Sequence, residues 1–442
     1  MQPVSLKIYC GGIPTRFADV TPTIPQGGIP MHEPKKTALA SFVLATTLAT
    51  TALAQDAQLD LKFAGALEFS DTGTLFVGDN YNGAVYAFDI KGTAALGQVA
   101  PVNILGIDIK IADVLGVAPS ALAINDMAVH PVSAEIYISV TRIGNFESAP
   151  AIMKITQTGK IELLDLTSFD FQKQVLSNYP DQETTFRPRG LGKKSPQARD
   201  LAKGEITLSS IAIMDMEYHE GELFVSGVAF DNFLSTLRRM PYPFDGAQSA
   251  ANVEMYHISH DQFETRAPIR AMSIHEIDGK TQLVAAYTCS PLVLIDLDEI
   301  VDGAQIKART IMDYGNGQPL DMVSYSFMGS DMLFLTSNSR GPQAIPVQGL
   351  SNAKAYAPED FKRGGQMDLF PTMPVGPVGK AVMFDGMSLH IDALGDGMFV
   401  SLTRDMFTGS LNMDSNANMF PNRLHNLVAE FDFPQYWAAK AE

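Results

Sequence analysis

Cysteine is nearly absent from this sequence: Cys10 and Cys289 are the only two among 442 residues. A chain with so few cysteines is not a small scaffold stapled by disulfides. Charged residues are also scarce, at 18%, whereas hydrophobic residues reach 46%. An apolar chain of this length can bury a large core, so an intrinsically disordered protein is excluded as well.

Basic residues are outnumbered. The chain has 32 Lys and Arg against 49 Asp and Glu, which gives a formal net charge of −17. Proteins that bind the phosphate backbone of nucleic acids normally need a basic face that displaces counterions. The composition therefore argues against a nucleic-acid partner.

A long run of uncharged residues lies near the N-terminus. Residues 35–54 read KKTALASFVLATTLATTALA and end in Ala-Leu-Ala before Gln55. This pattern predicts a signal peptide over residues 31–54, with residues 1–30 as an upstream extension foreign to the protein. A membrane anchor is the alternative, and the many Ala and Thr residues and the small-residue cleavage site disfavour it.

Cleavage after this segment would leave a mature chain without a membrane anchor. Residues 55–442 would then form a single domain that retains one cysteine, Cys289. An exported protein with one cysteine has no internal disulfide, so its stability must come from its core. We predict a periplasmic or secreted protein.

A degenerate repeat organises the mature chain. Its clearest part is a short apolar strand, and the copies of this strand begin 61, 87, 60, 50 and 65 residues apart. The copies are residues 75–79, 136–140, 223–227, 283–287, 333–337 and 398–402. This spacing fits four-stranded blades of roughly 40 to 50 residues with insertions.

Each of these second strands follows a first strand that repeats more closely. Four first strands place His or Tyr three residues after a Met, and three of them also have Asp before the Met: residues 126–130, 215–219, 271–275 and 321–325. The sixth first strand is expected near residues 379–385. Helix-period segments are scarce. The sequence predicts an all-β fold, a β-propeller of six or seven blades with two long inter-strand insertions.

One blade resembles a known superfamily. Residues 67–90, LEFSDTGTLFVGDNYNGAVYAFDI, resemble a blade of the NHL-type and the senescence-marker, gluconolactonase and paraoxonase-like propellers. The resemblance supports the fold more than any activity, because propellers host hydrolases, dehydrogenases and binding modules. In lactonase-like members Glu, Asn and Asp side chains hold a metal ion in the central channel. The Glu-Gly-Pro of their first blade is absent here.

Candidate site residues stand where first strands begin and second strands end, because these ends converge near the axis of a propeller. The first strands supply Asp126, Asp215 and Asp321, and the ends of second strands supply Arg142, Cys289, Asn338 and Arg404. Counted from the start of each second strand, Arg142, Cys289 and Arg404 occupy the same position. This count predicts a ring around the mouth of the channel.

We predict that this ring binds a small anionic or oxygenated molecule. The three aspartates would act as bases or, together with Asn338, as ligands of a divalent metal, calcium or zinc. Arg142 and Arg404 would stabilise charge. The alternative is that Asp and Arg side chains pair with one another and only cap the channel.

Cys289 has two interpretations. It could act as a nucleophile or, with a histidine, ligate copper, and the alternative is an inert buried thiol. The first-strand histidines, His130, His219 and His275, are interpreted as structural, because Tyr325 takes their place in another strand.

The two insertions are expected at residues 172–205 and 233–270. Within the first, six Lys and Arg crowd into residues 187–203, where Asp200 alone opposes them. Long loops in compact domains are often functional. This basic loop would cover the pocket as a lid or bind a protein partner.

The sequence thus leaves two classes of function open. One is an exported metal-dependent hydrolase, lactonase-like, with a copper- or thiol-dependent oxidoreductase as the other enzymatic possibility. The second is a non-catalytic propeller that binds a ligand or docks a partner.

Overall fold

The structure is a computed structural model. It describes residues 58–90, 99–142, 150–180, 184–186, 206–229, 235–258, 261–288, 291–313, 319–327, 329–337, 343–361, 382–383, 388–395, 398–404, 408 and 410–416. The predicted leader, residues 1–54, and the basic segment 187–203 lie outside these ranges. The described strands belong to the compact unit that contains Leu61–Glu442.

Most described strands form six four-stranded blades, each named here by its innermost strand. From the inside outwards, the first two blades are β1 (Leu67–Phe69), β2 (Thr74–Asp79), β3 (Ala84–Asp89) and β9 (Phe171–Val175), and β5 (Leu122–Val129), β6 (Ile136–Arg142), β7 (Ala151–Ile155) and β8 (Ile161–Leu163). The next two are β12 (Asp215–His219), β13 (Glu222–Val228), β14 (Ser235–Pro241) and β15 (Ser249–His257), and β17 (Ile269–Ile277), β18 (Lys280–Tyr287), β19 (Pro291–Asp296) and β20 (Gln305–Asp313). The last two are β21 (Pro319–Phe327), β22 (Ser330–Ser337), β23 (Gln343–Pro346) and β24 (Val382–Met383), and β25 (Ser388–Gly395), β26 (Met398–Arg404), β27 (Leu411–Asn416) and β4 (Asn103–Ile104). All six predicted second strands are found at the expected positions.

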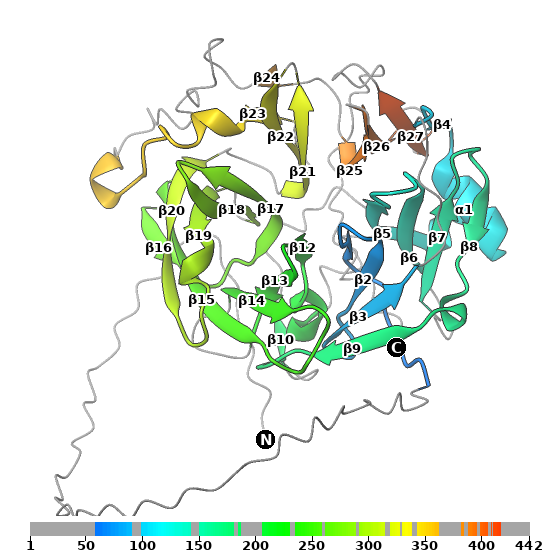
Figure 1. Cartoon of the computed structure of the whole chain (residues 1–442), viewed down its shortest axis with the longest axis horizontal. Helices are drawn as coiled ribbons and strands as arrows, with labels where there is room; N and C mark the ends of the chain where they lie inside the picture. The colour runs from blue at the N-terminus through cyan, green and yellow to red at the C-terminus, as the bar shows by residue number, and fades with distance from the viewer. Residues whose placement is uncertain are drawn as a thin grey trace, which may run out of the picture. The chain divides into compact units, whose positions relative to one another are not determined.

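The innermost strands contact one another in a closed ring. Their order around the ring is β5, β1, β12, β17, β21 and β25, and β25 contacts β5 again. Figure 1 shows the blades around this ring, with β12, β17 and β21 close to its centre. The all-β propeller predicted from the repeat is therefore confirmed.

The chain does not visit the blades in ring order. It starts in the β1 blade, moves to the β5 blade, and then returns past the β1 blade to the β12 blade. On the way out β4 completes the β25 blade, and on the way back β9 completes the β1 blade. Two blades are thus built from segments that are distant in the sequence.

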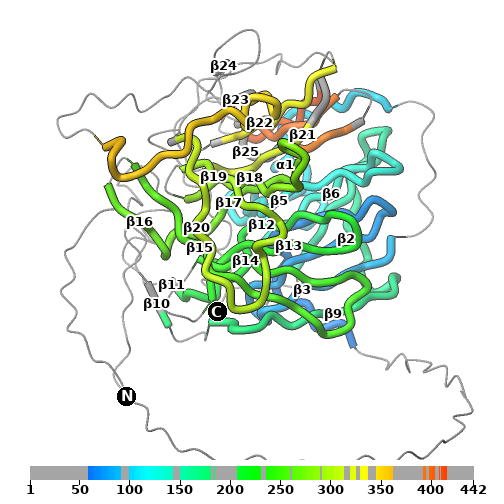
Figure 2. Tube along the Cα trace, turned by 60° about the vertical axis from the view of Figure 1, so that its left-hand side comes forward, coloured from blue at the N-terminus to red at the C-terminus, as the bar shows by residue number. Residues whose placement is uncertain are grey.

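The remaining elements connect the blades or cover them. Strands β15 and β20 pair in parallel at Asn252–Met255 and Gln305–Ala308, which joins the rims of two blades (Figure 2). The other elements are α1 (Ile107–Leu115), β10 (Thr185–Phe186), β11 (Ile206–Thr207), β16 (Gln262–Glu264), and the 3-10 turns Pro119–Ala121, Leu166–Ser168, Leu208–Ile211, Leu297–Glu299, Val347–Gly349 and Pro358–Asp360. No helix in the described ranges is long and apolar enough to cross a bilayer.

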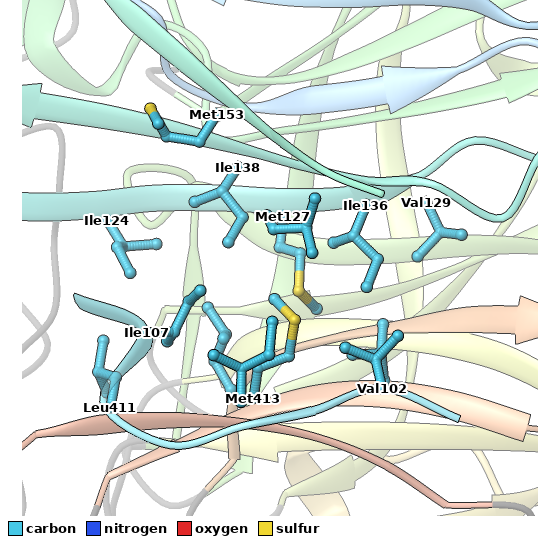
Figure 3. Packing of buried hydrophobic residues seen from close by; sticks show 14 of the residues in the cluster. Val102, Ile107, Ile124, Met127, Val129, Ile136, Ile138, Met153, Leu411 and Met413 are labelled. Atoms are coloured by element: carbon cyan, nitrogen blue, oxygen red, sulfur yellow. The ribbon is translucent and has the colours of Figure 1, made fainter. Parts of the chain in front are cut away.

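The methionine of the first-strand repeat fills the space between neighbouring blades. Met127 lies with Ile136 and Ile138 against Met413 of the β25 blade, and Ile107 of α1 closes the same cluster (Figure 3). The equivalent side chains Met216, Met272 and Met322 are also buried. An unbranched apolar side chain suits these wedges because it adapts to irregular gaps.

Small residues in the second strands let neighbouring inner strands come close. The Ser139 hydroxyl donates to the carbonyl of Gly65 at 2.6 Å, and the Ser226 hydroxyl lies 3.2 Å from the carbonyl of Ile269. Gly78 takes this place in β2, where a Cβ atom would come within 2.8 Å of Ile213. The repeat is therefore defined by small side chains at this place of the second strand as well as by its polar residues.

Three sequence expectations about boundaries need correction. The sixth first strand is Ser388–Gly395 and not residues 379–385, because Ala393 follows Asp392 where the repeat has Met. The segment 233–270 is not a simple insertion, since it carries β14, β15 and β16. Likewise the segment 172–205 begins inside β9. Strands β14 to β16 carry neither the Asp-Met pattern of the first strands nor the apolar run of the second strands, so the sequence did not locate them.

Candidate functional site

Two aspartates of the repeat, Asp126 and Asp215, bridge neighbouring inner strands. One oxygen of Asp126 accepts the backbone N–H of the residue after it, at 2.8 Å, and the other accepts the N–H of Leu67 on β1, at 2.7 Å. Asp215 accepts the N–H of its own next residue at 2.9 Å and that of Met272 on β17 at 2.7 Å. Asp321 accepts the N–H of its own next residue at 2.8 Å. Asp126, Asp215 and Asp321 are called the first tier here.

Three further carboxylates form a second tier, Glu68, Glu217 and Asp392. Asp392 occupies the repeat position of the aspartates in its own strand and also accepts the N–H of Ala393 at 2.6 Å, and it is grouped here by its bond to the neighbouring strand. All three accept N–H bonds from the next strand of the ring: Glu68 from Tyr218 at 3.2 Å, Glu217 from Ile274 at 3.1 Å and Asp392 from Val129 at 2.6 Å. Asp215 and Glu217 are two residues apart on β12, so they share one face of that strand. The two tiers therefore follow one another along the inner strands.

The six carboxylates remain partly exposed although they lie on the innermost strands. A side chain at this depth keeps exposed area only if solvent reaches the centre of the ring. Within the described ranges no three His, Cys, Asp or Glu residues are arranged to hold a metal ion. The metal site predicted from Asp126, Asp215, Asp321 and Asn338 stays a prediction, since Asn338 lies outside the described residues.

The protein environment favours the protonated form of the second tier. Burial raises the pKa of Glu217 to about 8, and the Asp392 carboxylate acts in the same direction. Burial raises the pKa of Asp392 to about 7. Burial, followed by Glu217 and Asp392, raises the pKa of Glu68 well above its ordinary value. Removal from water and like charge both disfavour ionisation, so these acids share fewer negative charges than their number suggests.

First-tier Asp215 is affected in the same way. Burial raises its pKa well above the ordinary value, and Asp126 and Glu217 add to the effect. Two backbone N–H donors act against this rise. The inner ring is therefore a set of interacting acids, and its members do not titrate independently.

Replacement of Asp126 by Ala is expected to lower the free energy of unfolding by about 2–4 kcal/mol, because two N–H groups lose a charged acceptor. Urea unfolding of both proteins measures this difference. Asp113→Ala, an exposed position on α1, is the control and should change stability by less than about 0.5 kcal/mol. Equal stability of Asp126→Ala and the parent would show that the bridge contributes nothing.

The predicted ring of Arg142, Cys289 and Arg404 is only partly described. Arg142 ends β6 and Arg404 ends β26, whereas Cys289 lies outside the described residues. Each arginine is the last residue of a seven-residue second strand, so the two occupy the same place when counted from the strand start. The ring around the mouth of the channel stays a prediction.

The histidines of the repeat differ in their contacts. His130 is buried, and its Nδ1 atom accepts the N–H groups of Val132 and Ser133, both at 3.1 Å. It thereby holds the turn after β5, in agreement with a structural role. His275 is half-buried, and its Nε2 atom lies 3.1 Å from the hydroxyl oxygen of Ser273.

Sequence reasoning missed the whole second tier. The sequence around these residues shows no shared motif, since Glu68 lies between Leu and Phe and Asp392 between Ile and Ala. The available signal was the alternation Asp215-Met216-Glu217, which places two carboxylates on one face of a strand. Extending that face to the other first strands would have found Glu68.

Comparisons with known proteins give structural likenesses only. No family model matches the chain, and no curated protein matches its sequence. The soluble aldose sugar dehydrogenase of Escherichia coli is similar at 11% identity, over 81% of this chain and 97% of that one, with a TM-score of 0.31.

Two other solved structures show the same level of likeness. The Swd1 β-propeller domain of Myceliophteria thermophila is 10% identical over 81% of this chain and 99% of that one, with a TM-score of 0.31. The GH43B protein of Bacteroides ovatus is 10% identical over 66% of this chain and 51% of that one, with a TM-score of 0.28. At these values the likenesses carry no argument about activity, and the resemblance to lactonase-like propellers remains at the level of the fold.

Proposed function

We propose that the protein is an exported hydrolase that cleaves a small hydroxylated molecule at the second-tier carboxylates. The observation that carries the proposal is the placement of Glu68, Glu217 and Asp392 on partly exposed faces of the inner strands, where burial and like charge raise the pKa of each carboxyl group. Carboxyl groups with perturbed pKa values in an accessible centre are typical of general acid–base sites.

The pKa values of Glu217 and Asp392 suit complementary roles in acid–base catalysis. With a pKa of about 8, Glu217 holds a proton at neutral pH and can donate it to a leaving oxygen. With a pKa of about 7, Asp392 is divided between both forms. Its two oxygens accept the N–H groups of Val129 and Ala393, and the lone pairs that remain on the ionised form can take a proton from water. The cluster thus offers an acid and a base together, as ester, lactone or glycoside hydrolysis requires.

The charge of the site favours a hydroxylated substrate over an anionic one. Carboxylates accept hydrogen bonds from hydroxyl groups, and protonated carboxyls donate them. An anion would meet like charge from both tiers. We therefore narrow the anionic or oxygenated ligand expected from the sequence to an uncharged oxygenated one.

A divalent metal, calcium or zinc, remains a proposal, and the acid–base scheme above assigns it no step. The first-tier aspartates already use both oxygens for backbone N–H groups in Asp126 and Asp215. Elemental analysis of the purified protein tests the metal, and a stoichiometric ion lost in Asp321→Ala would assign it to the first tier.

Hydrolysis assays with lactones, aryl esters and aryl glycosides test the proposed activity. Glu217→Gln is expected to lower kcat by about 10²- to 10⁴-fold, the usual contribution of a general acid. The control is Glu222→Gln, a half-exposed residue paired with Arg239 on the outer strands, which should retain full activity. Turnover that is equal in Glu217→Gln and the parent would overturn the assignment.

The backbone bonds of the first tier favour a second candidate function, a non-catalytic scaffold. If Asp126 and Asp215 only join blades, the ring is structural, and a protein partner would bind through the basic segment 187–203. Co-purification of a partner that is lost on neutralising Arg187 and Arg189, together with no turnover of any substrate, would support the scaffold.

A further inference from the structure

Three polar side chains connect the second tier to the opposite end of the inner strands. Glu217 on β12 accepts the N–H of Ile274 on β17 at 3.1 Å, and the hydroxyl of the adjacent Ser273 acts on Glu217 as a side-chain hydrogen-bond donor that lowers its pKa. The Ser273 hydroxyl oxygen lies 3.1 Å from Nε2 of His275 on the same strand. Ser273 is buried, whereas His275 is half-buried. The row therefore joins the partly exposed Glu217 to a second partly exposed group, His275.

We propose that Ser273 and His275 form a proton relay that reprotonates Glu217 after each turnover. This inference rests on the proposed function, in which Glu217 gives its proton to the leaving oxygen. It assigns His275 a task in addition to the structural role that its place in the repeat suggests.

The relay moves one proton and restores each group. After donation Glu217 is a carboxylate, and neutral His275 takes a proton from solvent to become an imidazolium. The Ser273 O–H proton then passes to the Glu217 carboxylate while the Nε2–H proton of His275 passes to the Ser273 oxygen. One O–H bond forms on Glu217 and one N–H bond breaks on His275, so the net transfer is one proton from solvent to Glu217.

The surrounding charges favour this direction of transfer. Burial lowers the pKa of His275, and Asp331 of β22 is the acidic group that acts against it. The pKa of Glu217 is higher, at about 8, and the charge of Asp392 on β25 helps to raise it. Glu68 on β1 and Asp215 on β12 complete the acids around Glu217. A proton on the imidazolium is therefore more stable on the Glu217 carboxylate.

A hydroxyl that bridges two titrating groups transmits the ionisation of one to the other. The chemical shift of the His275 Cε1–H proton, followed by NMR from pH 5 to 9, reports this transmission without any substrate. The parent protein is expected to show the titration of His275 itself and a second step near pH 8, where Glu217 ionises. The second step should vanish in Glu217→Gln.

The bridging hydroxyl is tested with a matched pair of nearly equal shape, Ser273→Thr and Ser273→Val. The threonine variant should retain the second step, and the valine variant should lose at least about half of its amplitude, because only the attraction through space remains. Ser273→Ala provides the same test should valine prevent folding. An equal step in the presence and absence of the hydroxyl, or no step near pH 8 in the parent, would overturn the relay.

These outcomes are separate from those of the hydrolase assays. A relay seen by NMR in a protein that hydrolyses nothing would overturn the proposed function alone. Hydrolysis that depends on Glu217 in a protein whose His275 does not sense Glu217 would overturn the relay alone. In an active enzyme, Ser273→Val should lower kcat with little change in KM.

Discussion

Replacement of Arg238 by methionine is expected to lower the free energy of unfolding by about 3–5 kcal/mol. Arg238 on β14 has no exposed surface, and its three nitrogens donate to backbone carbonyls of Ser177, Ala212 and Val228, at 3.2, 3.3 and 3.1 Å. These carbonyls belong to the chain after β9, the chain before β12 and the end of β13. A single guanidinium thus holds three segments together.

The effect is large because methionine fills much of the volume and supplies no donor. Buried carbonyls that lose a charged donor cost about 1–3 kcal/mol each, and neighbouring losses are not fully additive. Burial also lowers the pKa of Arg238 to about 10, because removal from water disfavours the charged form. Chemical unfolding in guanidinium chloride measures the change.

The adjacent residue provides the control. Arg239 lies on the other face of the same strand, is half-exposed and pairs with Glu222. Exposed ion pairs contribute about 0–1 kcal/mol, so Arg239→Met should be nearly neutral. Similar losses in the two variants would show that charge on β14, and not the carbonyl contacts of Arg238, is what matters.

Replacement of Glu217 by glutamine is expected to stabilise the protein at pH 8 by about 2–4 kcal/mol and to leave its stability at pH 5 nearly unchanged. An unfolded glutamate loses its proton near pH 4.3, whereas folded Glu217 retains its proton up to about pH 8. Between these values the folded state binds more protons than the unfolded state. Stability therefore falls as the pH rises through this window, and the neutral glutamine removes that fall.

The amide also preserves the local contact, since its oxygen can accept the Ile274 N–H as the carboxyl does. Thermal unfolding of both proteins from pH 5 to 8 gives the comparison. Glu254→Gln, on the outer strand β15, is the matched control and should follow the parent at each pH. A glutamine variant less stable than the parent at pH 8 would mean that a bound cation compensates the ionised Glu217.

The sequence predicts the parts of this fold that depend on local pattern. Apolar alternation locates the second strands, and the Asp-Met repeat locates the first strands, because both arise from the pleat and from contacts within one blade. Local pattern does not predict the order of the blades around the ring. The partners of β4 and β9 are distant strands, and short strands such as Asn103–Ile104 carry too little pattern to specify a partner.

The candidate site was predicted in part for a similar reason. Asp126, Asp215 and Asp321 were selected as polar residues at strand starts, which does place them on the inner strands. Their bonds to neighbouring N–H groups follow from the way two strands face each other, and no single strand reveals that. Asp392 escaped notice because irregular pairing in β25 displaces it from the count.

The out-of-order path of the chain has a consequence for folding. The backbone N–H of Gly106, beside β4, donates to the Asn412 side chain, 306 positions away. Contacts between such distant segments form late, because the entropy of closing long loops must be overcome first. The β1 blade likewise remains incomplete until its outer strand β9, residues 171–175, has paired with β3. Ring closure is therefore expected to be the slow step, and a chain shortened at its N-terminal side to beyond residue 104 would leave its last blade unfinished.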